Sequence, residues 1–240
     1  MRAMIWIVVV LTVLLAGAVV ADGVLRQQTE ERIATEMAAG IPGVEQPPAV
    51  SIGGFPFLTQ LMAGRLGSVH VTAPTATVDG LRLDDVVVEL TGVATEAPFT
   101  AEHAVMTAMT SADAVEAVLS VELDLSVRDG SLVASTTVLG LPLDVVLAPR
   151  AAGREVEVDV TGFVLAGASV QSADLPAGIA DQLQGIRFAV EGLPAGMTLT
   201  QVDVTPGGLR LSAEGRDLAL SRRLRWRGDE PVPPSDAHAG

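Results

Sequence analysis

The chain has 240 residues, a formal net charge of -14 and no cysteine. Such an acidic chain lacks the basic surface that nucleic acids select, so no nucleic-acid partner is expected. The absence of cysteine excludes disulfides and thiolate metal sites, so a fold of this size must be held together by apolar burial.

An uncharged apolar segment at residues 4–21 precedes the rest of the chain. As a helix it would extend about 27 Å, close to the roughly 30 Å core of a bilayer, which predicts a signal anchor over residues 1–21. A cleaved signal peptide is the alternative, because Val19-Val20-Ala21 suits a signal peptidase acting before Asp22. Both interpretations place everything after Asp22 outside the plasma membrane, either as a single-pass membrane protein or as a protein secreted to the periplasmic space.

Residues 22–48 predict an amphipathic helix followed by a linker. Apolar side chains gather on one side of residues 24–39, and Gly40 with Pro42 would end the helix. A short strand is expected at residues 49–52. Residues 55–64 have proline near the start and glycine at the end, which indicates a short, very apolar helix.

Alternating apolar and polar residues dominate from Gly67 onward and predict antiparallel strands. Asp84 and Asp85 interrupt the alternation by one residue, which indicates a β-bulge rather than a cation site. Residues 100–119 predict an internal helix with Thr100 as its N-cap, and residues 175–183 predict another short helix. Three acidic residues are expected to mark the wet face of a strand: Glu155, Glu157 and Asp159.

The expected fold class is therefore α+β, with an antiparallel β-rich curved sheet or flattened barrel against which helices pack. About nine strands are expected. One β-rich domain should span residues 49–227. Residues 228–240 should form a disordered tail, because they cannot bury enough apolar surface to fold.

No residue pattern indicates catalysis. The three histidines, His70, His103 and His238, form no spaced ligand pair, and no glycine-rich phosphate loop follows a strand. Residues 167–171 start like a nucleophile elbow but lack its final glycine. We therefore expect neither an enzyme, nor a cofactor, nor a metal site.

Aliphatic residues are abundant: the chain is 49% hydrophobic but only 3% aromatic. Either the core is filled by valine, leucine and alanine, or these residues line a cavity. A cavity between a curved sheet and helices would suit acyl chains, because each buried CH₂ contributes about 0.8 kcal/mol.

The predicted acyl-chain groove lies between the sheet and the helices expected near residues 57–62 and 105–109. Its predicted lipid-binding residues are Phe55, Phe57, Leu58, Leu61, Met62, Val105 and Met109. The alternative for the first five is that they plug the core. Gly53 and Gly54 fit either a close approach to a headgroup or a tight turn.

Three segments resemble the LmeA family of actinobacterial cell-envelope proteins. They are SIGGFPFLTQ at residues 51–60, LDDVVVELTGV at residues 83–93 and GLPAGMTL at residues 192–199. The resemblance implies a fold similar to tubular lipid-binding proteins and a role in maintaining envelope lipids or lipoglycans. Its implied partners are a phospholipid, with an anionic glycerophospholipid expected, and the membrane through the N-terminal helix.

A membrane-anchored, non-catalytic scaffold is the alternative function. It would present the β domain to an envelope enzyme such as a glycosyltransferase, and it would purify with that partner and without lipid.

Overall fold

The computed structural model describes residues 2–40, 46–78, 80–118, 124–138, 140–165, 167–171, 186–190 and 193–220. In the first helix, side chains are described from Ala18 to Ala39. The predicted helix at residues 175–183 and the predicted tail at residues 228–240 lie outside the described residues.

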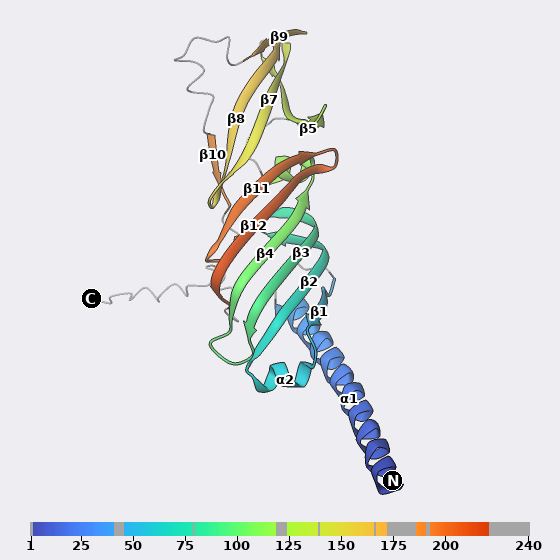
Figure 1. The fold of residues 1–240 in the computed structure, drawn as a ribbon. Helices are drawn as coiled ribbons and strands as arrows, with labels where there is room; N and C mark the ends of the chain where they lie inside the picture. The colour runs from blue at the N-terminus through green and yellow to red at the C-terminus, as the bar shows by residue number, and fades with distance from the viewer. Residues whose placement is uncertain are drawn as a thin grey trace, which may run out of the picture.

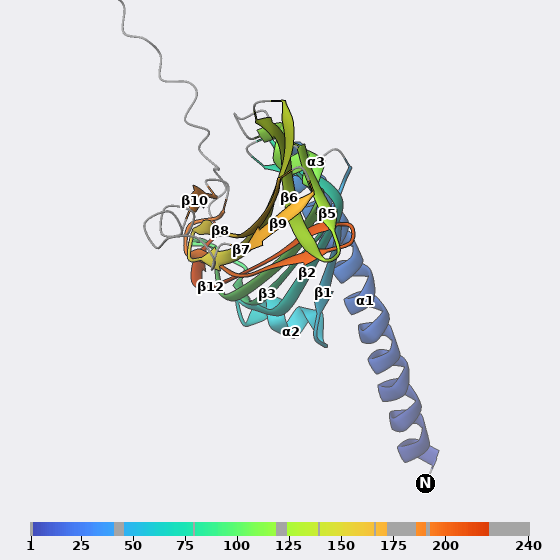
Figure 2. The ribbon, with the colours of Figure 1, turned by 90° about the horizontal axis from the view of Figure 1, so that it is seen from above.

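Two antiparallel sheets follow one another along the long axis of the molecule (Figure 1). Sheet A consists, in spatial order, of β1 (Ala49–Gly53), β2 (Arg65–Val78), β3 (Leu81–Ala94), β4 (Thr100–Thr110), β12 (Gly208–Ala219) and β11 (Met197–Thr205). Sheet B consists of β10 (Ile186–Ala189), β8 (Glu155–Leu165), β7 (Leu141–Ala152), β6 (Ser131–Val138) and β5 (Asp124–Arg128), with β9 (Ala168–Gln171) paired to β8. Sheet A is curled, as Figure 2 shows along the long axis. The prediction of curved, β-rich antiparallel sheets with a few helices is confirmed.

The helices are α1 (Arg2–Gly40), α2 (Phe57–Met62) and α3 (Ala112–Val118). Helix α1 ends at Gly40, as the sequence predicts, and its Ile33 and Met37 pack against the core next to β1. Among the residues with described side chains, no helix is both long enough and apolar enough to cross a membrane. Most of the apolar segment at residues 4–21 lies outside that set, so its role as an anchor stays a prediction.

The predicted helix over residues 100–119 is wrong for most of its length. Residues 100–110 form β4, which is hydrogen-bonded to β3 on one side and to β12 on the other. Ala104 and Ala108, four residues apart, fit one face of a helix, but the same spacing fits one face of a strand with period two. The two neighbouring strands decide between these possibilities, and only α3 remains helical.

The predicted β-bulge at Asp84 and Asp85 is confirmed. The register between β3 and β4 shifts after Asp84, and Asp85 adopts a φ of 51°. This left-handed conformation costs an ordinary L-residue about 1–2 kcal/mol, and aspartate tolerates it better than most residues.

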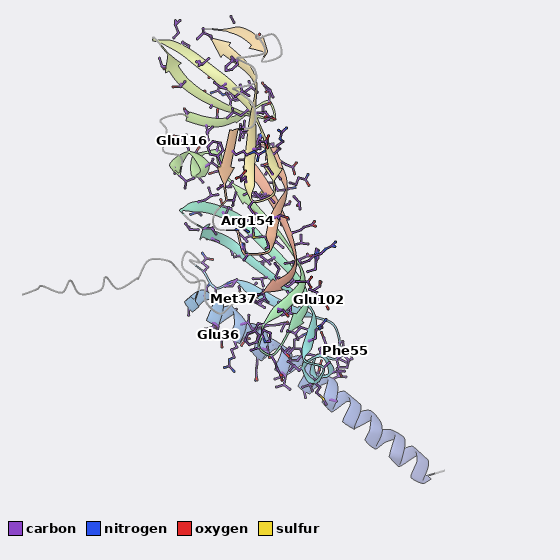
Figure 3. All side chains as sticks on the ribbon, turned by 90° about the vertical axis from the view of Figure 1, so that its left-hand side faces the viewer. Glu36, Met37, Phe55, Glu102, Glu116 and Arg154 are labelled. Atoms are coloured by element: carbon purple, nitrogen blue, oxygen red, sulfur yellow. The ribbon has the colours of Figure 1, made fainter. Side chains whose placement is uncertain are left out.

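The sheets join at the hairpin between β7 and β8. Leu199 of β11 donates its N–H to the carbonyl of Gly153 at 2.7 Å. The guanidinium of Arg154 donates to the carbonyls of Pro194 at 2.9 Å and Met197 at 3.1 Å. Figure 3 places Arg154 midway along the molecule. These bonds hold the β7–β8 hairpin of sheet B against the start of β11 in sheet A.

Asp22 links α1 to α2 over a sequence separation of 35 residues. Its buried carboxylate accepts the N–H of Phe57 at 2.9 Å and the N–H of Leu58 at 2.7 Å. These N–H groups belong to the first turn of α2, where no intrahelical partner exists, so Asp22 supplies the cap from outside the helix. About two turns further along α1, the carboxylate of Glu30 accepts the N–H of Ile52 in β1.

Replacing Asp85 with valine should destabilise the protein by about 1–2 kcal/mol, because a β-branched residue disfavours the left-handed conformation. Asp85→Gly is the matched control and should be at least as stable as the wild type. Chemical denaturation of the full chain in detergent micelles measures both variants. Equal stability of the valine and glycine variants would contradict this account of the bulge.

Asp22→Ala should cost about 1–3 kcal/mol, because it leaves the buried N–H of Phe57 without an acceptor. Asp22→Asn keeps one acceptor oxygen and should lose less. The same denaturation experiment measures both, and an alanine variant as stable as the wild type would show that the cap contributes nothing.

Candidate functional site: the aliphatic inner face

One face of sheet A is apolar across all six strands. We call it the inner face, and it is defined by two neighbouring cross-strand rows. The first row consists of Ile52, Val69, Leu90, Ala104, Gly215 and Met197. The second row consists of Val50, Val71, Val88, Met106, Ala213 and Leu199.

The row between these two lies on the opposite, outer face of the same sheet. It consists of Ser51, His70, Glu89, Val105, Glu214 and Thr198. Five of its six residues are exposed and Val105 is half-buried; Nδ1 of His70 lies 3.5 Å from Oε1 of Glu89. Because side chains of a strand alternate between faces, a shift of one residue separates the aliphatic surface from the polar one.

Burial varies across the inner face. Ala104 and Ala213 are fully buried beneath Leu193, Met197 and Leu218. Four larger apolar residues in the middle strands remain half-buried: Val88, Leu90 and Met106 of these rows, and Leu211, which shares the inner face because it lies two residues before Ala213 on β12. The inner face is therefore covered near β11, and in the middle of the sheet it keeps apolar surface that other groups can contact.

The aliphatic surface continues into sheet B. One row of sheet B consists of Val127, Leu132, Leu147 and Val160, and the next consists of Leu125, Ala134, Val145 and Phe163. Val204 of β11 packs against this cluster, while Ala151 and Val156 pack against the cluster of sheet A. Apolar contacts thus run without interruption from one sheet to the other.

Charged groups on β7 and β8 lie on the outer face of sheet B. Glu155, Glu157 and Asp159 share that face, as the sequence predicts, but Glu157 is buried rather than wet. It pairs with Arg150 and with Arg187, and Arg150 also pairs with Asp159 at 2.8 Å. The hydrogen bond from Arg150 to Glu157, with the charge of Asp159, raises the pKa of Arg150 above its ordinary value. The two guanidinium groups shield Glu157 from water and neutralise it.

A second outer-face pair lies further along sheet B. The hydroxyl of Ser135 donates to Asp144 at 2.6 Å, and Arg128 pairs with the same carboxylate at 2.8 Å. The Ser135 hydrogen bond, followed by the charge of Arg128, lowers the pKa of Asp144. The charged side chains of these two groups are therefore paired with one another on the outer face.

The predicted lipid-binding residues of α2 divide into two groups. Phe57 is fully buried against Ile52 and Val69, so it fills the core. Four residues are exposed: Phe55, Leu58, Leu61 and Met62. They belong to α2 or directly precede it, and α2 lies at the lower end of sheet A in Figure 1. Whether any of these binds lipid stays a prediction.

The other two predicted residues, Val105 and Met109, lie on β4 and not on a helix. Val105 stands between Glu89 and Glu214, and Met109 stands opposite Arg210. Both positions belong to the outer face. Sequence reasoning missed their neighbour Met106 on the inner face, because residues 101–110 fit a helix as well as a strand and only the pairing with β3 and β12 shows which face each residue occupies.

Gly54 makes a tight turn between β1 and α2. Its φ is 89°, and a Cβ at this position would lie 2.7 Å from Nε2 of Gln60. The Gln60 side chain donates to the carbonyl of Gly53 at 3.2 Å and accepts the N–H of Gly67 at 2.7 Å. The turn interpretation of this glycine pair therefore has a structural basis, because the glutamine occupies the space beside Gly54.

Metal ligands do not assemble in the described part of the chain, where no three His, Cys, Asp or Glu residues come together. The inner face offers neither a charge nor a hydroxyl in the two rows that define it. Its chemistry is therefore restricted to apolar contact, which suits a hydrocarbon chain.

Comparison with protein families gives one match, to LmeA-like phospholipid-binding proteins, over residues 20–214. Searches among curated proteins and among solved structures found no match. The matched range includes the second half of α1, α2 and nearly all of both sheets. The chain thus belongs to the LmeA-like phospholipid-binding family.

Proposed function

We propose that the chain holds a phospholipid by its acyl chains on the aliphatic inner face, outside the plasma membrane, without catalysing a reaction. The observation that carries this proposal is the pair of uncharged rows that crosses all six strands of sheet A. The four half-buried residues Val88, Leu90, Met106 and Leu211 would contact the hydrocarbon.

The physical basis of binding is apolar burial. Each CH₂ group removed from water contributes about 0.8 kcal/mol, so a long acyl chain could supply strong binding without any directed polar contact. The continuous contacts between sheets A and B would offer the chain an extended surface. An anionic glycerophospholipid is the proposed ligand class.

The proposed setting is the cell envelope. Residues 4–21 would anchor the protein in the plasma membrane with both sheets outside, and the bound lipid would serve the maintenance of envelope lipids or lipoglycans. The family membership and the uncharged N-terminal segment support this setting.

Val88→Trp should remove most of the bound phospholipid, because the indole would occupy apolar space on the inner face. Val87→Trp is the matched control: Val87 precedes Val88 on the same strand, is equally half-buried and lies on the outer face. We expect this control to keep its lipid. Native mass spectrometry with lipid extraction, on full-length protein purified from bacterial membranes, measures the lipid content.

The same experiment compares the uptake of two added lipids, phosphatidylglycerol and phosphatidylcholine. Preferential uptake of phosphatidylglycerol would support the proposed ligand class. Wild-type protein that is free of lipid and takes up neither would contradict the proposed function. A co-purifying envelope enzyme in that case would favour the scaffold alternative.

A further inference from the structure

Four large apolar side chains around α2 are exposed. The exposed fractions are 66% for Phe55, 37% for Leu58, 38% for Leu61 and 90% for Met62. Only Phe57 of this short helix points into the core. Single exposed apolar residues are common, but a group of this size in one short segment marks a contact surface.

Helix α1 extends this exposed surface. Its Val19, Val20, Val24 and Leu25 are exposed on the turns that surround Asp22. The two hydrogen bonds from α2 to the Asp22 carboxylate hold the two helices in contact at this level. We call the eight residues together the basal patch: Phe55, Leu58, Leu61, Met62, Val19, Val20, Val24 and Leu25.

The position of the basal patch identifies its partner. Helix α1 runs from the patch away from both sheets, as Figures 1 and 2 show, and its sequence is uncharged from residue 4 to residue 21. On the other side of the patch charges begin at once, with Arg26 and Glu30 paired at 3.9 Å. A chain that leaves a bilayer passes from the hydrocarbon core through the interfacial layer into water. The order of an apolar segment, an apolar patch and then charged residues matches these three environments.

We propose that the basal patch inserts into the outer interfacial layer of a phospholipid bilayer, with α2 lying at the level where α1 leaves the hydrocarbon. Asp22 sets this depth, because it is the first charged residue after the apolar segment and its charge is satisfied by α2 rather than by water. Phe57 of the same helix packs beside Ile52 and Val69 at the lower end of the inner face. Helix α2 therefore connects the membrane contact with the proposed lipid-binding surface.

This inference rests on the proposed function only for the presence of a membrane next to α1. Acyl-chain binding and insertion of α2 are separate properties, and one preparation can measure both. Because the chain contains no cysteine, a single introduced cysteine carries a probe at one known position.

The experiment uses full-length Met62→Cys labelled with a polarity-sensitive fluorophore, in vesicles of phosphatidylglycerol and phosphatidylethanolamine. Met62 is almost fully exposed, so the substitution leaves the core intact. The matched control is Thr198→Cys, which is exposed on the outer face at the opposite edge of sheet A. We expect the Met62 probe to be severalfold less accessible to aqueous iodide than the control, and to be quenched by lipids that carry a spin label near the headgroup.

Equal iodide quenching of the two probes would overturn insertion of the basal patch. Shielding that increases with protein density at constant lipid would also overturn it, because a second copy of the chain would then cover the patch. If the Met62 probe stays in water while phospholipid is extracted from the same protein, the result contradicts insertion of the basal patch and still supports the proposed function. A shielded probe without extractable lipid would instead support the inference and contradict acyl-chain binding.

Discussion

The need to cover one apolar face of a six-stranded sheet governs the rest of this structure. Two rows of side chains cross sheet A without a single charge, so that face cannot stay in water. Curling of the sheet, Ile33 and Met37 of α1 at one edge, and Leu193 and Leu218 near the other edge each cover part of it. The middle strands keep half-buried aliphatic residues, which a bound acyl chain would cover.

The same constraint explains why the ion pairs of sheet B lie on its outer face. Arg150 and Arg187 neutralise Glu157, and Arg128 with Ser135 satisfies Asp144, all on the outer side of sheet B. A charge on the inner face would have no partner and would be costly to bury. The same separation lets apolar side chains pack across the junction of sheets A and B, where hydrogen bonds from Arg154 and Leu199 also join the two sheets.

Local patterns in the sequence predict much of this fold, because alternation, turn residues and the Asp84-Asp85 interruption all act within a few residues. Local patterns do not predict the structure of residues 100–110, because Ala104 and Ala108 fit a helix and a strand equally well. Pairing with two distant strands makes this segment a strand. The residues around α2 are apolar in any reading, so sequence could not separate buried Phe57 from exposed Phe55 and Met62. No local pattern predicts that Asp22 caps α2, since its hydrogen-bond partners lie 35 and 36 residues away.

The most direct test of the central claim is photocrosslinking with a phosphatidylglycerol that carries a diazirine in one acyl chain, followed by peptide mapping of the full-length protein. The account predicts that labels gather on β3, β4 and β12 at the inner-face positions Val88, Leu90, Met106 and Leu211. Labels spread evenly over inner and outer faces, or confined to α1, would contradict the claim that the inner face holds the lipid.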